Sequence, residues 1–251
     1  MKVLITGASS GIGKEMALYL NNLGHELILV GRDLDKLEEV KNNCQKAKII
    51  KCDLSDENEV ISLHEKVKNE NLDVLINNAG FGLFGYFHET ELENELKMIN
   101  VNIKAVHILT KLFLKDFIEK NSGYILNVAS AAGFMAGPYL NTYYATKNYV
   151  VKLTMGIYEE LKSQNSKVRI SALCPGPVNT NFNNVAGGYF NTKSLSSSYV
   201  AKYAIDQMFK NKLIIIPSLK MKLAIFFTRL IPTKLMLKIV YKIQKNKTKA
   251  T

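Results

Sequence analysis

Tyr143 and Lys147 are the pair of residues in this sequence whose types and spacing most directly suggest chemistry. A separation of four positions places two side chains on the same face of a helix. An ammonium group beside a phenol favours the phenolate, so Lys147 would lower the pKa of Tyr143 from about 10 toward neutral pH. Such a tyrosine can protonate a carbonyl oxygen as a hydride arrives, or remove the proton in the reverse reaction. Tyr144, three residues from the same lysine, is a rival for this role.

A serine lies where it could hold the oxygen of the same substrate. Ser130 follows an apolar run, Tyr124–Val128, that predicts a buried strand. In a parallel sheet, ligands bind at the carboxyl ends of such strands. The spacing Tyr-x-x-x-Lys arises by chance in many helices, so this pair indicates a site only together with Ser130. The three residues predict acid–base catalysis on a carbonyl or an alcohol.

The glycine-rich segment Thr6–Gly13 predicts a binding site for a nucleotide phosphate. It joins an apolar run, Lys2–Ile5, to an amphipathic helix that starts at Lys14. Glycines allow the tight turn and the close approach of a ligand, and the free N–H groups of the first helical turn favour an anion. The expected contacts are Gly7, Ser9, Ser10, Gly11, Ile12 and Gly13.

The same segment also matches the Gly-x-Ser-x-Gly turn that carries the nucleophile of many serine hydrolases. That turn lies in the middle of its sheet, whereas only one predicted strand precedes the segment here. Such hydrolases also need a histidine late in the chain, and no histidine follows His107. These two departures exclude a nucleophilic serine in the glycine-rich segment.

Polar residues follow the next two predicted strands. Arg32 comes after the run Glu26–Val30, and its guanidinium suits the 2′-phosphate of NADP through two charge-assisted hydrogen bonds. The alternative is that Arg32 pairs with Asp33 or Asp35 at the surface. Asp53 follows the third strand and either binds the adenine amine or caps the next helix. The predicted cofactor is therefore NADP(H), with Arg32 as the selecting residue.

Strands and helices alternate along the chain, and this alternation predicts an α/β fold of the Rossmann type. The expected architecture is a doubly wound parallel sheet of about seven strands with helices on both faces. The predicted strands are Lys2–Ile5, Glu26–Val30, Ala47–Lys51, Leu72–Ile76, Tyr124–Val128, Val168–Leu173 and Leu213–Ile216. The predicted helices include Leu34–Cys44, a segment beginning at Asp53, Leu92–Phe117 and Thr142–Ser163. We expect residues 1–216 to form one dinucleotide-binding catalytic domain and residues 217–251 a C-terminal extension.

Taken together, these motifs resemble those of the short-chain dehydrogenases/reductases. The resemblance runs to about residue 216 and is carried by Thr6–Gly13, Asn77–Gly80, Asn102, Ser130, Tyr143-x-x-x-Lys147 and Cys174–Gly176. It implies that Tyr143 is the acid/base, that Lys147 lowers its pKa and holds the nicotinamide ribose, and that Ser130 orients the substrate oxygen. It further implies that Asn102, rather than the nearby Asn100, completes a proton relay through water.

The resemblance also implies further cofactor contacts and an assembly. The implied contacts are Asn78, Ala79 and Gly80 on the adenosine side and Pro175, Gly176, Val178 and Thr180 on the nicotinamide side, besides Tyr143 and Lys147. Arg32 matches the NADP-preferring members. The helices Leu92–Phe117 and Thr142–Ser163 commonly form the subunit interface in this family, so a homodimer or homotetramer is expected. No metal is expected, because the four histidines are scattered without ligand spacing.

The predicted function is NADPH-dependent reduction of a carbonyl, or oxidation of the corresponding alcohol. The alternative is a nucleotide-binding sensor without turnover, against which the complete set of Ser130, Tyr143 and Lys147 argues. Apolar side chains in the predicted loops favour a lipophilic substrate, unless they pack on the core instead. These residues are Phe81, Leu83, Phe84, Phe134, Met135, Tyr139, Phe182 and Phe190. The segment Asn181–Ser198, rich in Asn, Gly and Ser, is predicted to be a mobile lid.

The positive charge of the chain is concentrated at its C-terminal end. The net charge is +11, and Gln207–Thr251 contains eleven Lys or Arg and no Asp or Glu. These lysines lack a nucleic-acid recognition motif and alternate with aliphatic residues, which suits a lipid surface better than a nucleic acid. The three scattered cysteines and the absence of a signal-peptide pattern predict a cytoplasmic protein. No apolar run reaches the roughly 20 residues that would span a bilayer.

The basic end of the chain contains two short amphipathic segments, Leu219–Leu230 and Leu235–Ile243, separated at Pro232. The second segment places Leu235, Ile239 and Ile243 on one helical face, beside a stripe of Lys234, Lys238, Lys242 and Lys245. Aliphatic residues next to lysines are typical of a helix that lies in the interface of an anionic membrane. The alternative is that the apolar face packs on the body of the protein or on a partner subunit.

Overall fold

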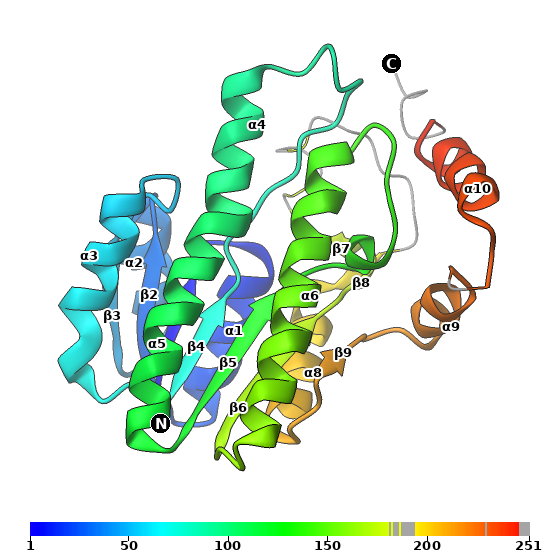
Figure 1. The fold of residues 1–251 in the computed structure, drawn as a ribbon. Helices are drawn as coiled ribbons and strands as arrows, with labels where there is room; N and C mark the ends of the chain where they lie inside the picture. Colours follow the sequence, from blue (N-terminus) through cyan, green and yellow to red (C-terminus); the bar gives the residue numbers. More distant parts are fainter. Residues whose placement is uncertain (181, 183–185, 187–193, 229, 246–251) are drawn as a thin grey trace.

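A parallel sheet of seven strands forms the centre of the structure, which is a computed structural model (Figure 1). The described residues are 1–180, 182, 186, 194–228 and 230–245. The strands, in the order in which they lie side by side, are β3 (Ala47–Lys51), β2 (Glu26–Gly31), β1 (Lys2–Thr6), β4 (Val74–Asn77), β5 (Gly123–Val128), β6 (Val168–Leu173) and β9 (Ile214–Ile215). This order confirms the predicted Rossmann-type doubly wound sheet. A separate parallel pair joins β7 (Val178–Asn179) to β8 (Leu195–Ser196).

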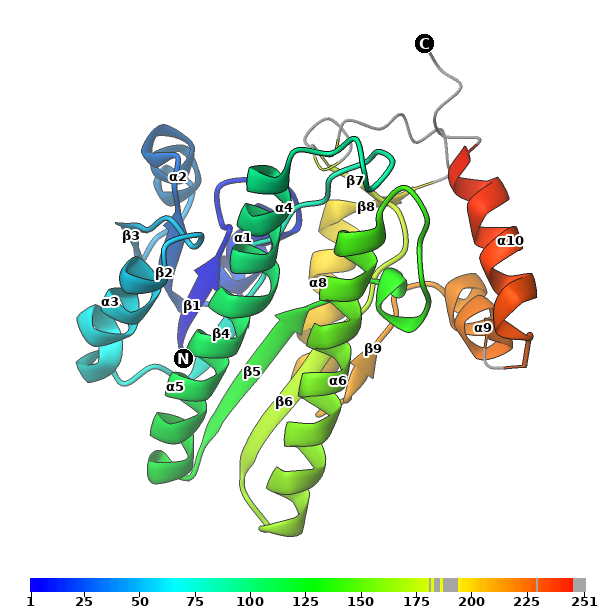
Figure 2. The ribbon, with the colours of Figure 1, turned by 45° about the horizontal axis from the view of Figure 1, so that its top comes forward.

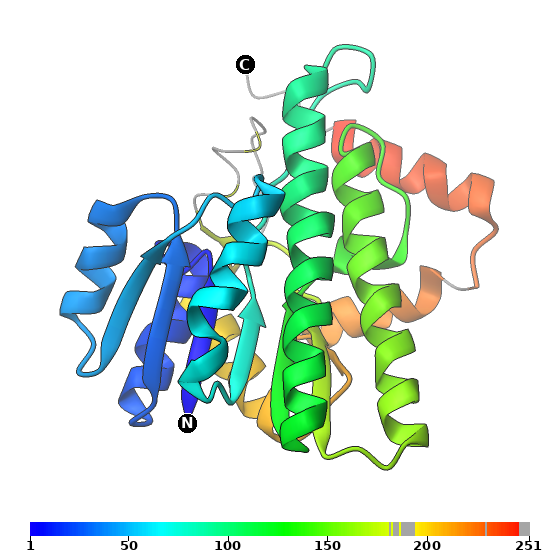
Figure 3. The same ribbon diagram turned by 60° about the vertical axis from the view of Figure 1, so that its left-hand side comes forward.

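Helices cover both faces of the sheet (Figures 1 and 3). The α-helices of the described residues are α1 (Gly11–Asn22), α2 (Leu34–Asn42), α3 (Glu57–Val67), α4 (Leu92–Ile99), α5 (Val106–Lys120), α6 (Asn141–Ser163), α8 (Ser197–Phe209), α9 (Leu219–Thr228) and α10 (Thr233–Lys245). One face of the sheet packs against α1, α2 and α8, and the other against α3, α5 and the end of α6. Consecutive strand residues such as Leu4 and Ile5 point to opposite faces of the sheet. Both are fully buried, because helices cover each face.

The helix predicted over Leu92–Phe117 is continuous but not uniform. A π-helical stretch, Asn100–Ala105, connects α4 to α5, and Asn102 lies within it. A π-helical turn contains an extra residue, so it shifts the side chains that follow relative to the regular spacing. Periodicity alone predicted a single regular helix here, since an insertion of one residue leaves little trace in the apolar pattern.

Two predicted boundaries were wrong. The helix after β3 begins at Glu57, and its N-cap is Asp56, whose carboxylate accepts the N–H groups of Asn58 and Glu59. Asp53 therefore does not cap this helix. Of the predicted lid, residues 181, 183–185 and 187–193 lie outside the described residues, and its last four residues are β8 and the start of α8 rather than a loop.

The C-terminal helices α9 and α10 lie side by side at the edge of the fold beyond α6 and β9 (Figures 1 and 2). Ile225 of α9 is 5% exposed and belongs to an apolar cluster with Ile216 and residues of α6. Val240 and Gln244 of α10 are buried against the body. Among the described residues, no helix combines the length and apolarity needed to cross a membrane.

Candidate active site

A cavity of about 1150 Å³ lies at the carboxyl ends of the central strands. The strand order reverses between β1 and β4, so the loops that follow these two strands diverge and leave a crevice between them. The cavity is lined by most of the residues predicted from the sequence, namely Gly7, Ser9, Ser10, Gly11, Ile12, Arg32, Asp53, Asn78, Ala79, Gly80, Ser130, Tyr143, Lys147, Pro175, Gly176, Val178 and Thr180. The other two, Gly13 and Asn102, are buried next to it.

The turn between β1 and α1 has the geometry of an anion site. Gly7 and Gly11 have φ values of 65° and 55°, in the left-handed region that favours glycine. A Cβ atom on Gly13 would lie 2.4 Å from the carbonyl oxygen of Gly7, so only glycine fits there. Ser10 is the N-cap of α1, but its side chain makes no capping hydrogen bond. The hydroxyl and the first-turn N–H groups thus fit a nucleotide phosphate.

The turn that follows β4, which contains Asn78 and Ala79, is hydrogen-bonded to the glycine turn. The Asn78 side-chain amide donates to the backbone oxygens of Thr6, at 3.0 Å, and Gly7, at 3.1 Å. The Thr6 hydroxyl in turn accepts the backbone N–H groups of Asn78 and Ala79. Thr6 begins the predicted segment Thr6–Gly13, but the sequence analysis assigned no role to its hydroxyl, although a hydroxyl at a strand end was the available signal. Asn78 thus supports the phosphate turn as well as lining the cavity.

Arg32 is free to bind a ligand. It is exposed and lines the cavity, and it makes no hydrogen bond or ion pair with any residue that the structure describes. The alternative pairing partner Asp33 instead caps α2 and pairs with Lys36 at 2.7 Å. Burial opposes the ionisation of Asp53, but hydrogen bonds from Ser55 and the charge of Arg32 outweigh it and lower its pKa.

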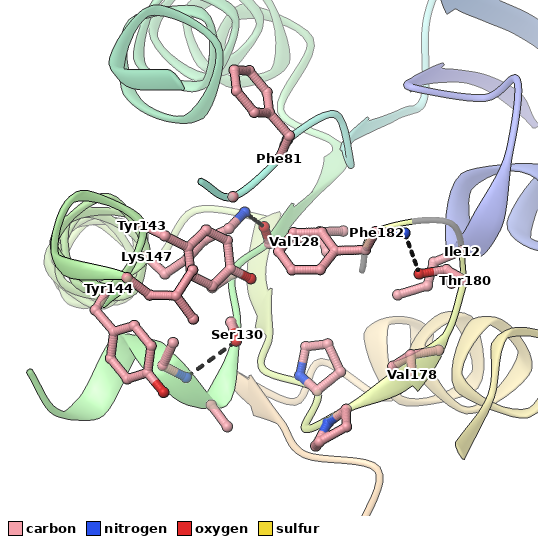
Figure 4. A pocket seen from close by; sticks show the side chains of 18 of the residues that line it. Ile12, Phe81, Val128, Ser130, Tyr143, Tyr144, Lys147, Val178, Thr180 and Phe182 are labelled. Atoms are coloured by element: carbon pink, nitrogen blue, oxygen red, sulfur yellow. Dashed lines mark hydrogen bonds between the residues drawn. The ribbon is translucent and has the colours of Figure 1, made fainter. Parts of the chain in front are cut away.

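Tyr143 and Ser130 lie next to each other in the cavity. Figure 4 shows the Tyr143 hydroxyl directed toward Ser130, with the Phe182 ring beside the Tyr143 ring. Burial of the hydroxyl raises the pKa of Tyr143 to about 12, although the Ser130 hydroxyl donates to its oxygen and works in the opposite direction. The Ser130 oxygen also accepts the N–H of Ala132 at 3.1 Å, which fixes its position. The expected lowering of the Tyr143 pKa was therefore wrong, because burial dominates.

Lys147 lies close to Tyr143 and is fixed in position by a hydrogen bond to the backbone. Its side chain is 5% exposed, and the ammonium donates to the backbone oxygen of Val128 at 2.8 Å. The same nitrogen lies 5.9 Å from the centre of the Tyr143 ring. Burial lowers the pKa of Lys147 to about 8. The spacing of four residues thus brings the two side chains together, as a helix requires.

Asn102 is fully buried beside this group. Its Nδ2 donates to the backbone oxygen of Phe81 at 2.9 Å and to the Thr146 hydroxyl at 3.1 Å. Its Oδ1 accepts the Phe81 N–H at 3.1 Å and keeps a second lone pair. The rival Asn100 donates instead to the backbone oxygen of Ser55 and does not itself line the cavity.

The rival tyrosine, Tyr144, has a different partner. Gln244 of α10 donates to the Tyr144 hydroxyl at 2.6 Å. Tyr139, in the segment before α6, donates in a similar way to the Tyr241 hydroxyl at 3.4 Å. Sequence reasoning missed Tyr241 and Gln244, because it examined only the face of α10 that carries Leu235.

The predicted apolar pocket is only partly present. Phe81, Leu83, Met135 and Phe182 line the cavity. Phe134 packs against the core instead, and Phe84 stacks on Tyr139 at 5.5 Å between ring centres. Phe190 lies outside the described residues. The missing walls come from α9 and α10, which contribute Met221, Ala224, Phe227, Met236, Ile239, Val240 and Ile243.

The doubly wound sheet, the glycine turn at its switch point and the Ser–Tyr–Lys group on one cavity define a dinucleotide-dependent oxidoreductase. The family model described as "short chain dehydrogenase" matches residues 1–187, and the chain belongs to this family. Enzymes of this kind act on CH–OH groups with NAD(P). Within the described part of the chain, no cluster of three His, Cys, Asp or Glu could hold a metal ion.

Three similar proteins illustrate the relationship. An uncharacterized oxidoreductase of Staphylococcus saprophyticus is 35% identical over 213 residues, covering 83% of this chain and 82% of its own. The dehydrogenase/reductase SDR family member 11 of Gallus gallus is 35% identical over 191 residues, covering 71% and 75%. The solved structure of a short-chain dehydrogenase from Sphingobium yanoikuyae in complex with NADPH superposes with a TM-score of 0.83, at 27% identity and 94% coverage of both chains.

Proposed function

We propose that this enzyme reduces the carbonyl of a lipophilic substrate with NADPH, or oxidises the corresponding alcohol with NADP. The observation that carries the proposal is the position of the Tyr143 hydroxyl beside Ser130 and near Lys147, in the same cavity that the glycine turn lines. The Ser–Tyr–Lys group and the glycine turn lie within residues 1–216, which we assign as the catalytic domain. We assign residues 217–251 as a C-terminal extension, of which α9 and α10 contribute walls of the cavity.

The residues present fit the cofactor at both ends. The glycine turn and the Ser10 hydroxyl suit its pyrophosphate, and Arg32, which pairs with none of the described residues, suits a 2′-phosphate. Asp53 would bind the adenine amine. The remaining contacts would come from Asn78, Ala79 and Gly80 on the adenosine side and from Pro175, Gly176, Val178 and Thr180 on the nicotinamide side.

Proton transfer would be the task of the chain's own residues, while NADPH, when bound, supplies the hydride. The Ser130 hydroxyl holds the substrate oxygen, and the Tyr143 hydroxyl beside it donates its proton to that oxygen. The Lys147 ammonium stabilises the negative charge that develops on the phenol oxygen. The free lone pair of Asn102 Oδ1 can accept from a water that returns the proton.

Turnover itself tests the proposal. Full-length protein is incubated with NADPH and a panel of ketones and aldehydes, or with NADP and the matching alcohols, and the NADPH absorbance is followed. We expect consumption of NADPH with apolar carbonyl compounds, because the walls from α9 and α10 are aliphatic and aromatic. Binding of NADPH without turnover of any compound would contradict the proposal and support the nucleotide-binding sensor.

The rate of reduction should depend on pH through Lys147. Its pKa is lowered to about 8, so it loses its charge as the pH rises through this value, whereas Tyr143, with its pKa raised to about 12, stays protonated. We expect kcat/KM to be constant below about pH 7 and to fall about tenfold per unit well above pH 8. Lys147→Arg, which keeps its charge, should show no such fall in its residual rate. A rate that rises through pH 8 would contradict the assignment.

We also propose two partners for the enzyme. The first is a second copy of the chain, packed through the helices Leu92–Phe117 and Thr142–Ser163, on which Leu92 and Leu96 are 71% and 49% exposed. Light scattering should then give the mass of a dimer or tetramer, and the mass of one chain would contradict this interface.

The second proposed partner is an anionic membrane surface contacted by the basic C-terminal helices, which would make this cytoplasmic enzyme peripheral to the membrane.

A further inference from the structure

Apolar side chains are exposed along the two C-terminal helices in unusual number. They form what we call the α9–α10 strip, which consists of Leu219, Leu223, Phe226, Phe227, Leu230, Leu235, Ile239 and Ile243. These side chains are between 38% and 72% exposed. Single exposed apolar residues are normal, but a contiguous group marks a surface that contacts another apolar phase.

The exposure of the strip does not result from loose helices. The opposite faces of α9 and α10 are anchored on the body, because Ile225 and Val240 are each 5% exposed. Gln244 donates to the Tyr144 hydroxyl at 2.6 Å, and Tyr139 donates to the Tyr241 hydroxyl at 3.4 Å. The face of α10 with Val240 and Gln244 thus packs on the body, while the neighbouring face with Ile239 remains exposed.

The strip reaches into the cavity. Phe227, Ile239 and Ile243 line the cavity wall and are nevertheless 53%, 38% and 52% exposed. A side chain that borders both the cavity and the outside stands at its entrance. The entrance that these three residues form therefore lies between α9 and α10 and is apolar.

Positive charge surrounds the strip. Lys220, Lys234, Lys238 and Lys242 are exposed, and none of them forms an ion pair with any residue that the structure describes. The sequence from Gln207 to the end contains no Asp or Glu that could neutralise them. Unpaired lysines beside exposed aliphatic side chains complement the phosphates and acyl chains of an anionic bilayer.

We propose that the α9–α10 strip docks on an anionic lipid bilayer and that apolar substrates pass from the lipid into the cavity between α9 and α10. The route leads past Phe227, Ile239 and Ile243. Docking brings this entrance into contact with the acyl region, so a lipophilic substrate need not cross water. The route rests on the proposed function, whereas docking can be measured without turnover.

Docking is tested by co-sedimentation of the full chain with vesicles of phosphatidylcholine and phosphatidylserine, at low and high salt. Leu223→Ser/Phe226→Ser changes strip residues that do not line the cavity, and Lys234→Glu/Lys238→Glu reverses two charges. Each is expected to lower vesicle binding about tenfold or more. The control Ile61→Ser, at a residue 42% exposed on α3, should bind normally.

Several outcomes would overturn docking. One is full-length protein that stays in the supernatant with anionic vesicles at low salt. Another is binding that persists in both double variants. A change of oligomeric mass in Leu223→Ser/Phe226→Ser, with unchanged vesicle binding, would assign the strip to a second copy of the chain instead.

The route is tested with 6-propionyl-2-dimethylaminonaphthalene, a fluorescent apolar ketone, preloaded into the same vesicles. Ile239→Trp narrows the entrance, whereas Leu235→Trp places the same bulk on the strip outside the cavity lining. Uptake of the probe by the vesicle-bound protein, followed by fluorescence, should slow about tenfold in Ile239→Trp only, the effect of ~1.4 kcal/mol of added barrier. Equal uptake by both variants would overturn the route. Failure of the proposed function would appear separately, as probe uptake without NADPH consumption.

Discussion

Tyr143→Phe is expected to lower kcat/KM for carbonyl reduction by at least about 100-fold, the usual lower range for loss of a general acid. The substitution removes the hydroxyl that hydrogen-bonds Ser130 and leaves the ring that packs near Phe182. Steady-state rates with NADPH and a reducible ketone measure the loss. The affinity for NADPH, titrated by fluorescence, should change little, because the phosphate sites lie at the glycine turn and Arg32.

Tyr144→Phe is the matched control, since it removes a neighbouring hydroxyl from the same helix. That hydroxyl accepts from Gln244 and lies in the wall toward α10, so its loss should affect substrate KM more than kcat. Activity retained in Tyr143→Phe and lost in Tyr144→Phe would reverse the assignment of the two tyrosines. Activity retained in both would refute the proposed mechanism.

Arg32→Ala is expected to weaken NADPH binding by roughly 1.5–3 kcal/mol, about 10- to 150-fold, which is typical of a lost charged hydrogen bond. NADH has no 2′-phosphate, so its affinity should be nearly unchanged. The expectation depends on Arg32 lining the cavity without an ion pair to any described residue. A guanidinium already paired with a carboxylate would bind the phosphate of a ligand less strongly. Calorimetric titration of both cofactors measures the difference.

Lys36→Ala provides the matched control for Arg32, because it also removes a cation near the start of α2. Lys36 is engaged with Asp33 at 2.7 Å, so its removal should not discriminate between the two cofactors. Wild-type protein that binds NADH as tightly as NADPH would rule out the proposed preference. An equal loss of both cofactors in Arg32→Ala would instead show that Arg32 supports the fold of the cavity.

Several features of this protein could be predicted because they depend on neighbouring residues in the chain. The apolar strand runs and the helices between them predicted the doubly wound sheet, since each pattern follows from local backbone geometry. The left-handed φ of Gly7 and the tight contact at Gly13 are likewise requirements of one short turn. The four-residue spacing of Tyr143 and Lys147 placed both on one helical face without knowledge of any other element.

Tertiary structure decided the properties that depend on contacts between distant segments. Burial raises the pKa of Tyr143 to about 12, although the nearby lysine predicted the opposite, because desolvation arises only when the walls of the cavity assemble. The distinct partners of Tyr143 and Tyr144 depend on Ser130 and on Gln244, which is 100 residues from Tyr144 in sequence.

The sequence alone determined the sheet, the nucleotide turn and the spacing of Tyr143 and Lys147, because these features are encoded within one turn or one helix. It could not determine which face of α10 meets the body. Apolar residues lie on two neighbouring faces of this helix, one with Val240 and one with Ile239, so its periodicity fits either orientation. Packing against Tyr139 and Tyr144 selects one of them, because only that face carries polar groups that reach both tyrosines.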